Sequence, residues 1–193
     1  SVNALNGVFG GYVDSIPMII VSGQARTDNI ASDYVPGLRQ FGDQEVDIVN
    51  MIKPITKYAV RLKKNDNFIK IFHKALSIAT DGRQGPVWVD IPIDIQSMLI
   101  EKPKLKDLKK NKIQHTYDKK NYLDKKIDKI ISSLKKSCRP VILVGNGVRF
   151  SGKYNEFLNL IERLSIPVLP VFNSADLIPN KHKLYCGRPG AEG

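Results

Sequence analysis

Two short groups of polar residues have side chains that could hold a substrate or a cofactor. Ser22-Gly23-Gln24 follows the apolar run Ile16–Val21, and Gly42-Asp43-Gln44 lies near the end of the polar segment that comes next. A glutamine amide donates and accepts hydrogen bonds at once, which suits a polar group of a bound molecule. The alternative interpretation is that both amides only satisfy the backbone of their own loops.

The other residues that could do chemistry form no catalytic set. No Ser/His/Asp or Cys/His combination can be assembled from the spacing of the three histidines, His73, His115 and His182. Cys138 and Cys186 stand alone, without a CxxC pair, which argues against a disulfide framework or a zinc site, and we expect both to be at least partly buried. Gly145-Asn146-Gly147 follows another apolar run. It is either a weak phosphate-binding signal or a tight strand-to-helix turn.

Strands and helices that alternate along the chain must position these residues. Continuous apolar runs predict buried strands, and apolar residues at helical spacing predict amphipathic helices. The predicted strands are residues 16–21, 55–62, 87–91, 140–144 and 166–171, and the predicted helices are 4–13, 45–51, 68–79, 123–134 and 154–164. For the helix at 45–51 we expect an N-cap near Asp43. The alternation predicts an α/β fold with mainly parallel sheets.

The predicted organisation is two successive doubly wound units, both truncated and joined by a Lys-rich linker. Residues 1–96 form the first unit, residues 97–120 the linker and residues 121–193 the second unit. The sequence begins as if inside a helix and stops in a loop, so we expect it to be a piece of a longer chain. Ligands bind at the carboxyl ends of strands in such sheets, where we expect both glutamines to lie.

The net charge of +11, from 30 Lys and Arg against 19 Asp and Glu, suggests nucleic-acid binding as an alternative. Its distribution argues against that function. Between residues 101 and 136 there are 13 Lys and 5 acidic residues, with no Arg and only two Tyr. Arg reads and stacks on bases, so this segment is predicted to be a solvated surface. No apolar run approaches the roughly 18 residues of a membrane span. We predict neither a nucleic-acid nor a membrane partner.

Seven short motifs occur in a fixed order along the chain. They are Asn3-Ala4-Leu5-Asn6-Gly7, Asp14-Ser15-Ile16-Pro17, Ser22-Gly23-Gln24, Gln44-Glu45-Val46-Asp47, Ile55-Thr56-Lys57, Gly82-Arg83-Gln84-Gly85-Pro86-Val87 and Asp90-Ile91-Pro92. In order and spacing they resemble thiamine-diphosphate-dependent enzymes of the acetolactate synthase-like group. The resemblance implies that residues 1–96 are the C-terminal part of the pyrimidine-binding domain. It implies that residues 121–193 are the N-terminal part of the Rossmann-like central domain.

The resemblance also implies a function. It implies a lyase or transferase that cleaves or forms carbon–carbon bonds of 2-keto acids through a cofactor ylide and enamine. The two lone cysteines indicate a reducing compartment, so we expect a cytoplasmic location. The implied cofactors are thiamine diphosphate with Mg²⁺, and FAD in members that bind it. The implied assembly is a homodimer or homotetramer. The alternative function is a catalytically decayed nucleotide- or flavin-binding module.

Site residues follow from the same resemblance, position by position. Gln44 matches a glutamine that faces cofactor and substrate, and Gln24 is placed with it on the catalytic side. The cofactor-binding positions are Asn3, Arg83, Gly145, Asn146, Gly147 and Arg188, of which Arg83 and the second-unit residues lie near the flavin where one is bound. The activating glutamate lies upstream of Asn3 and the Mg²⁺ motif in a third domain. No metal ligand is therefore predicted here, and Glu45 is not the base.

Two positions depart from the acetolactate synthase pattern. Gly42-Asp43 stands where those enzymes usually have Ala-Phe, and Ile93 stands where they usually have Lys. Both positions belong to the substrate region, so an aromatic wall and a cation are lost and a carboxylate is gained. A carboxylate repels an anionic acceptor in a partly desolvated pocket. We therefore predict a poor acetolactate former that prefers a polar, less anionic acceptor.

Overall fold

The computed structural model describes residues 1–34, 36–100 and 120–190. Most of the predicted linker at 97–120, His115 included, lies outside the described residues. The chain divides into two compact units, residues 1–113 and 114–193. Each described unit contains a parallel sheet with helices packed on it, which confirms the predicted α/β fold with parallel strands.

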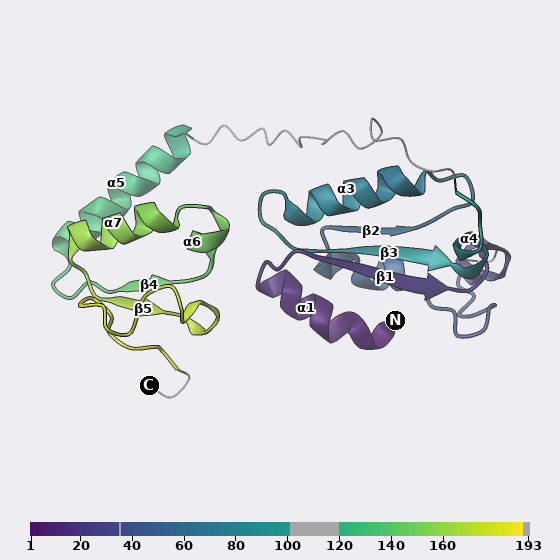
Figure 1. Ribbon diagram of the computed structural model, residues 1–193, viewed down its shortest axis with the longest axis horizontal. Helices are drawn as coiled ribbons and strands as arrows, with labels where there is room; N and C mark the ends of the chain where they lie inside the picture. Colours follow the sequence, from purple (N-terminus) through teal and green to yellow (C-terminus); the bar gives the residue numbers. More distant parts are fainter. Residues whose placement is uncertain (35, 101–119, 191–193) are drawn as a thin grey trace. The chain divides into compact units, whose positions relative to one another are not determined.

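The first unit is built on a three-stranded parallel sheet with strand order β1-β3-β2. Its strands are β1 (Met18–Gln24), β2 (Tyr58–Arg61) and β3 (Pro86–Pro92), and its helices are α1 (Leu5–Val13), α2 (Ile48–Ile52), α3 (Phe68–Thr80) and α4 (Ile93–Gln96). Helix α3 lies on one side of the sheet and α1 on the other (Figure 1). Because both faces are covered, the central strand β3 is apolar over nearly its whole length.

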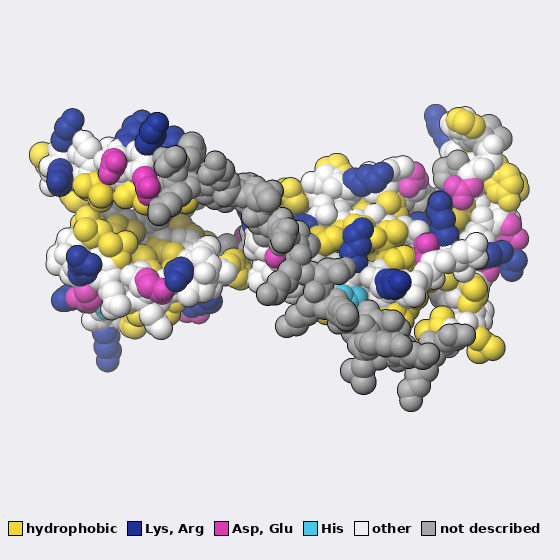
Figure 2. All heavy atoms as spheres, turned by 90° about the horizontal axis from the view of Figure 1, so that it is seen from above, with side chains coloured by type: hydrophobic (Ala, Val, Ile, Leu, Met, Phe, Trp, Pro, Cys, Tyr) yellow, Lys and Arg dark blue, Asp and Glu magenta, His cyan; other side chains and the backbone are white. Residues whose placement is uncertain are grey.

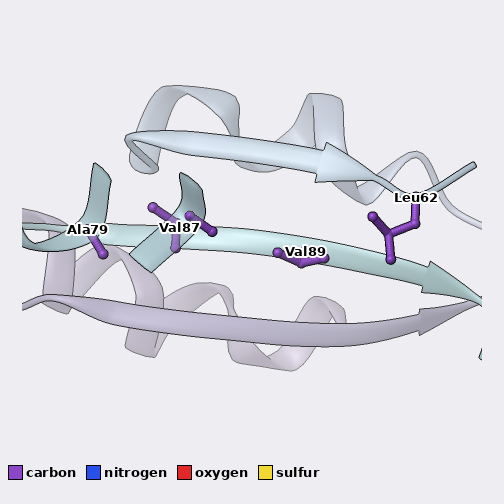
Figure 3. Close-up of a cluster of buried hydrophobic side chains, with 5 residues drawn as sticks. Leu62, Ala79, Val87 and Val89 are labelled. Atoms are coloured by element: carbon purple, nitrogen blue, oxygen red, sulfur yellow. The ribbon is translucent and has the colours of Figure 1, made fainter. Parts of the chain in front are cut away.

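Successive residues of β3 pack into two cores on opposite faces of the sheet. Val87 and Val89 pack with residues of α3 and with Leu62, which follows β2 (Figure 3). Trp88 points to the other face, in a cluster with residues of α1 and α2. Each large side chain buried in this way contributes roughly 1.5–3 kcal/mol. The two cores hold β3 rigidly, and the site lies at its carboxyl end.

The strand predicted from residue 55 begins three residues later. Lys53–Ile55 form a 3₁₀ turn that contains Pro54, and β2 starts at Tyr58. Proline fixes φ near the helical value, so the apolar run around it does not extend into the strand.

The predicted N-cap is also wrong. Helix α2 begins at Ile48, and its N-cap is Asp47, whose Oδ1 accepts the backbone N–H of Asn50 at 3.2 Å. Asp43 lies too far upstream to accept from the first turn of this helix, because a cap bonds two or three residues ahead. Asp43 therefore has no capping role in α2.

The second unit contains a two-stranded parallel sheet. Its elements are α5 (Lys120–Lys136), β4 (Ile142–Val144), α6 (Gly147–Phe150), α7 (Tyr154–Leu164) and β5 (Val168–Pro170). The core joins Val144 and Val168 of the strands to Ile161 of α7 and to Leu177 and Ile178 beyond β5. Cys138 and Cys186 are both exposed, so the expectation of partial burial is wrong. Cys138 lies two residues after the end of α5, and Cys186 comes directly after Tyr185, which forms an isolated bridge to Val168 of β5.

Surface charge is spread over the described residues. On the face drawn in Figure 2, Lys and Arg side chains lie in separate groups with acidic and apolar side chains between them. Within the described ranges, no helix is both long and apolar enough to cross a bilayer.

Candidate functional site

The candidate site lies at the carboxyl edge of the first sheet. Strands β1 and β3 run parallel, with Gln24 opposite Pro92 at their ends, and Ile93 opens α4 directly afterwards. Both arrowheads point to the same edge of the sheet (Figure 1). The segment after β1, which carries Gln44, is tied back to Gln24. The sheet thus places Gln24 and Ile93 at one edge, and the hydrogen bond from Gln24 to Val46 ties the segment that carries Asp43 and Gln44 to that edge.

Gln24 uses all of its polar atoms within the fold. Its Nε2 donates to the carbonyl oxygen of Val46 at 2.8 Å and to Asp90 Oδ2 at 3.1 Å. Its Oε1 accepts the backbone N–H of Ala25 at 3.0 Å. The side chain therefore holds the loop in place, which favours the structural alternative considered for this glutamine.

Gln44 has the opposite surroundings. Its side chain is exposed, and no residue in the described part of the chain hydrogen-bonds to its amide. Its φ angle is +52°, in the left-handed region. For a residue other than glycine this conformation costs on the order of 1–3 kcal/mol and persists where surrounding structure imposes it. A strained backbone that presents an available amide is typical of a functional residue.

Glu45 and Gly42 impose the shape of this loop. The Glu45 carboxylate accepts the backbone N–H of Ala31 at 2.7 Å on one oxygen, and those of Phe41 and Gly42 at 3.0 and 3.1 Å on the other. Gly42 packs so closely that a Cβ there would lie 2.7 Å from a backbone oxygen of the neighbouring segment. Glu45 therefore holds the loop in this shape through three hydrogen bonds to its backbone.

The buried carboxylate of Asp90 supports the site through its hydrogen bond with Gln24. Asp90 is fully buried, and its Oδ1 accepts the Ser22 hydroxyl at 2.5 Å. The indole N–H of Trp88 donates to the same Ser22 oxygen at 2.7 Å. Burial raises the pKa of Asp90, although the hydrogen bonds from Ser22 and Gln24 oppose this effect. No buried side-chain nitrogen or oxygen in the described residues lacks a partner, so the polar cluster is fully satisfied.

A second carboxylate anchors the start of the same loop. Asp94 of α4 accepts the backbone N–H of Thr27 at 3.0 Å and the Thr27 hydroxyl at 2.6 Å. Desolvation alone would raise the pKa of Asp94, but these hydrogen bonds and nearby Lys64 lower it. The adjacent Ile93 leaves 56% of its surface exposed at this edge.

The sequence patterns do not predict that Asp90, Asp94 and Glu45 support the site. One signal was present for Asp90, because a charged residue inside the apolar run Val87–Ile91 is rarely buried without a role. Asp94 and Glu45 also bind the backbone of Thr27 and Ala31, 67 and 14 residues away, and no local pattern reveals those contacts.

One of the predicted cofactor positions of the first unit, Arg83, lies at the opposite edge of the sheet. Arg83 donates from Nε to the Ser15 hydroxyl at 2.9 Å and from Nη2 to the Val13 carbonyl oxygen at 3.4 Å, at the amino-terminal edge of the sheet. A seven-residue strand at about 3.3 Å per residue separates this edge from Gln24 by about 20 Å. Asn3 is exposed in the 3₁₀ turn that precedes α1.

The remaining predicted positions belong to the second unit. Gly145 and Asn146 connect β4 to Gly147, the first residue of the four-residue helix α6. Arg149 of α6 pairs with Asp176 at 3.1 Å, which holds this turn against the segment after β5. Arg188 is exposed and lies 3.5 Å from Asn180 Oδ1. The connection from β4 to α6 through Gly145 and Asn146 is a tight strand-to-helix turn.

Comparisons with known proteins cover the whole chain. Residues 127–193 match the thiamine pyrophosphate enzyme central domain family. The chain is 29% identical over 191 residues to the acetolactate synthase large subunit of Lactococcus lactis, covering 99% of this chain and 31% of that protein. It is 34% identical over 197 residues to the probable acetolactate synthase large subunit of Methanocaldococcus jannaschii, with the same two coverages.

The chain is thus similar along its length to acetolactate synthase large subunits, and its residues 127–193 match the central domain of thiamine pyrophosphate enzymes. The chain shares its fold with benzoylformate decarboxylase from Polynucleobacter necessarius, which superposes with a TM-score of 0.68 at 21% identity over 96% of this chain and 33% of that one. The chain spans 31% of the length of the two synthase relatives above. Within the described residues, no group of three or more His, Cys, Asp or Glu side chains could hold a metal ion.

Proposed function

We propose that the chain is part of a thiamine-diphosphate-dependent 2-keto acid decarboxylase or carboligase. One observation carries the proposal. Gln44 has an exposed amide and a left-handed backbone, and it lies on a loop held by Glu45 at the carboxyl edge of a parallel sheet. Ligands bind at that edge in open α/β sheets. The similarity of the chain to acetolactate synthase large subunits along its whole length supports the same function.

The residues present fit the polar ring end of this cofactor. When bound, thiamine diphosphate supplies a nucleophilic carbon and an electron sink for chemistry at the 2-keto carbonyl. The Gln44 amide offers both donors and an acceptor, which matches a ring or a substrate carbonyl that presents both kinds of polar group. Glu45 and Gln24 hold its backbone still, so that this amide needs little reorganisation on binding. We propose that Mg²⁺ and the diphosphate are held by residues outside this chain.

The test is carbon dioxide release by the full-length enzyme. The purified protein is incubated with thiamine diphosphate, Mg²⁺ and each of a series of 2-keto acids that includes pyruvate. We expect release that depends on the added cofactor. A folded protein that releases no carbon dioxide from any of these acids would contradict the proposal and favour a decayed nucleotide- or flavin-binding module.

The acceptor preference is a finer part of the proposal. Asp43 is exposed beside Gln44, and Ile93 is exposed at the end of β3, so both side chains reach the solvent at the site edge. A carboxylate there disfavours an anionic acceptor such as a second pyruvate and favours hydroxyl or amine groups. We expect little acetolactate from pyruvate, and more from the double variant Asp43→Phe, Ile93→Lys. Ordinary turnover to acetolactate, roughly 1–1,000 per second, would contradict this preference.

Flavin binding, assembly and location complete the proposal. We propose a cytoplasmic homodimer or homotetramer whose second unit can bind FAD near Gly145-Asn146-Gly147 and Arg188. An absorbance spectrum of the purified full-length enzyme tests for flavin, and its mass in solution tests the assembly. A colourless protein that takes up no added FAD would contradict the flavin site alone.

A further inference from the structure

A buried polar cluster lies beneath the loop that carries Gln44. Asp90 accepts the Ser22 hydroxyl, and Trp88 donates its indole N–H to the Ser22 oxygen, which leaves the serine proton directed at Asp90. The sheet does not need a charge at this position, because a buried carboxylate costs free energy that an apolar residue would not. Asp90 therefore calls for an explanation other than packing.

Asp90 reaches the loop through Gln24. The Nε2 group of Gln24 donates at once to Asp90 Oδ2 and to the carbonyl oxygen of Val46. Both partners of Nε2 are acceptors, and the partner of Oε1 is the N–H of Ala25, so the amide has a single orientation. By binding Nε2, the Asp90 carboxylate fixes the position of the amide group that donates to the Val46 carbonyl oxygen.

Val46 stands two residues after Gln44, on the backbone that carries the positive φ angle. The Glu45 side chain reaches back to the N–H groups of Phe41 and Gly42, on the other side of Gln44. The backbone around Gln44 is thus tied on both sides. A left-handed residue other than glycine persists only where its surroundings over-determine it. The link from Asp90 through Gln24 to Val46 is one of these ties.

We propose that Asp90 is a positioning residue, whose carboxylate acts through Gln24 to set the backbone at Val46 and so the direction in which Gln44 presents its amide. This inference rests on the proposed function, because Gln44 has a catalytic task only if cofactor and substrate bind at this edge. Asp90 is buried beneath the loop and acts without contacting either of them.

Kinetics of three variants test the link in the full-length enzyme: Asp90→Asn, Gln24→Met and the double variant. Asparagine must turn its NH₂ group toward Ser22 or Gln24, each of which donates to Asp90 in the wild type, so one of these hydrogen bonds is lost. Methionine keeps the length of Gln24 without its donors. We expect each single change to lower kcat about 10- to 100-fold, with a smaller change in KM. Residues that act in series give a double variant no slower than the slower single variant. Losses that multiply, or an unchanged kcat for Asp90→Asn, would overturn the proposal.

Hydrogen–deuterium exchange of residues 41–46 gives a readout that does not depend on activity. We expect about tenfold faster exchange in both single variants, because a tie of the loop is lost. Lys57→Met is the matched control, since Lys57 lies at the amino-terminal edge of the sheet and should leave exchange at 41–46 unchanged. If the enzyme is active and exchange of residues 41–46 is unchanged in Asp90→Asn, the inference is wrong. Faster exchange in an enzyme without 2-keto acid turnover would support the Asp90 link and refute the proposed function.

Discussion

Replacing Gln44 by alanine removes the amide and leaves the loop otherwise intact. The side chain is exposed and makes no hydrogen bond to the described residues, so the free energy of unfolding should change little. If the amide contacts cofactor or substrate, kcat of the full-length enzyme should fall about 10- to 1,000-fold, as for other positioned polar groups. Unchanged steady-state kinetics in Gln44→Ala would return Gln44 to a structural role.

Gln44→Gly is the matched variant, because glycine adopts the φ angle of +52° without strain. It should lose as much activity as Gln44→Ala while raising the free energy of unfolding by roughly 0.5–1 kcal/mol. Urea unfolding measures the second effect. If the glycine variant is less stable than the alanine variant, the left-handed conformation at this position is not strained.

The pH dependence of stability tests the surroundings of Asp90. Burial raises the pKa of Asp90 above its ordinary value of 3.8, so between the two values the folded chain binds more protons than the unfolded chain. The free energy of unfolding then falls as pH rises through this window. Asparagine carries no such proton. The stability advantage of wild type over Asp90→Asn should therefore be largest at about pH 3 and shrink toward about pH 7 in urea unfolding. An advantage that grows with pH would mean that the hydrogen bonds outweigh burial.

At the scale of elements, sequence patterns predicted the long helices and central strands well. The apolar stripe at 68–79 corresponds to α3, and the run at 87–91 to β3, because each pattern reports a face that packs against the core. The helix at 45–51 was predicted less well, since its start depends on the Asp47 cap and on loop contacts to Glu45. Local periodicity does not contain such contacts between distant segments.

Helix α5 shows what periodicity leaves open. Its apolar stripe was predicted, yet Ile127 and Ile130 are 49% and 58% exposed. A hydrophobic period establishes which face of a helix is apolar, and it does not establish what covers that face.

Lys57, which directly precedes β2, binds the carboxyl end of α3. Its ammonium group donates to the carbonyl oxygens of Ile78 and of Asp81, the latter at 2.6 Å. Cations at a helix carboxyl end satisfy orphan carbonyl groups and complement the helix dipole. Burial lowers the pKa of Lys57 and nearby Asp81 opposes this shift, so the charged group depends on these acceptors.

Lys57→Met should therefore lower the free energy of unfolding by roughly 1.5–3 kcal/mol, the range for hydrogen bonds to charged groups. Lys70→Met removes the same charge from an exposed position of α3 and should stay within roughly 0.5 kcal/mol of wild type. Urea unfolding of both variants measures the difference. Equal effects would mean that Lys57 does not cap α3.

At the scale of the whole molecule, the candidate site described above lies within the first unit. Gln44 and its supports lie in the first unit, and the described residues contain no cluster that could hold a metal ion. The chain also spans 31% of the length of its synthase relatives. By the family resemblance, the activating glutamate and the Mg²⁺ motif lie outside these residues. Binding and turnover should therefore require the full-length enzyme.

The 193-residue chain alone should show no 2-keto acid turnover and no tight binding of thiamine diphosphate with Mg²⁺. Isothermal titration and carbon dioxide release measure the two, with the full-length enzyme as control and circular dichroism to establish that the chain is folded. Exposed apolar residues of β1, such as Ile19 and Val21, should also promote association of the isolated chain, so light scattering should be followed in parallel. Turnover by the folded chain would show that the residues needed for chemistry lie within it. The expectation that the activating glutamate and the Mg²⁺ motif lie outside it would then be wrong.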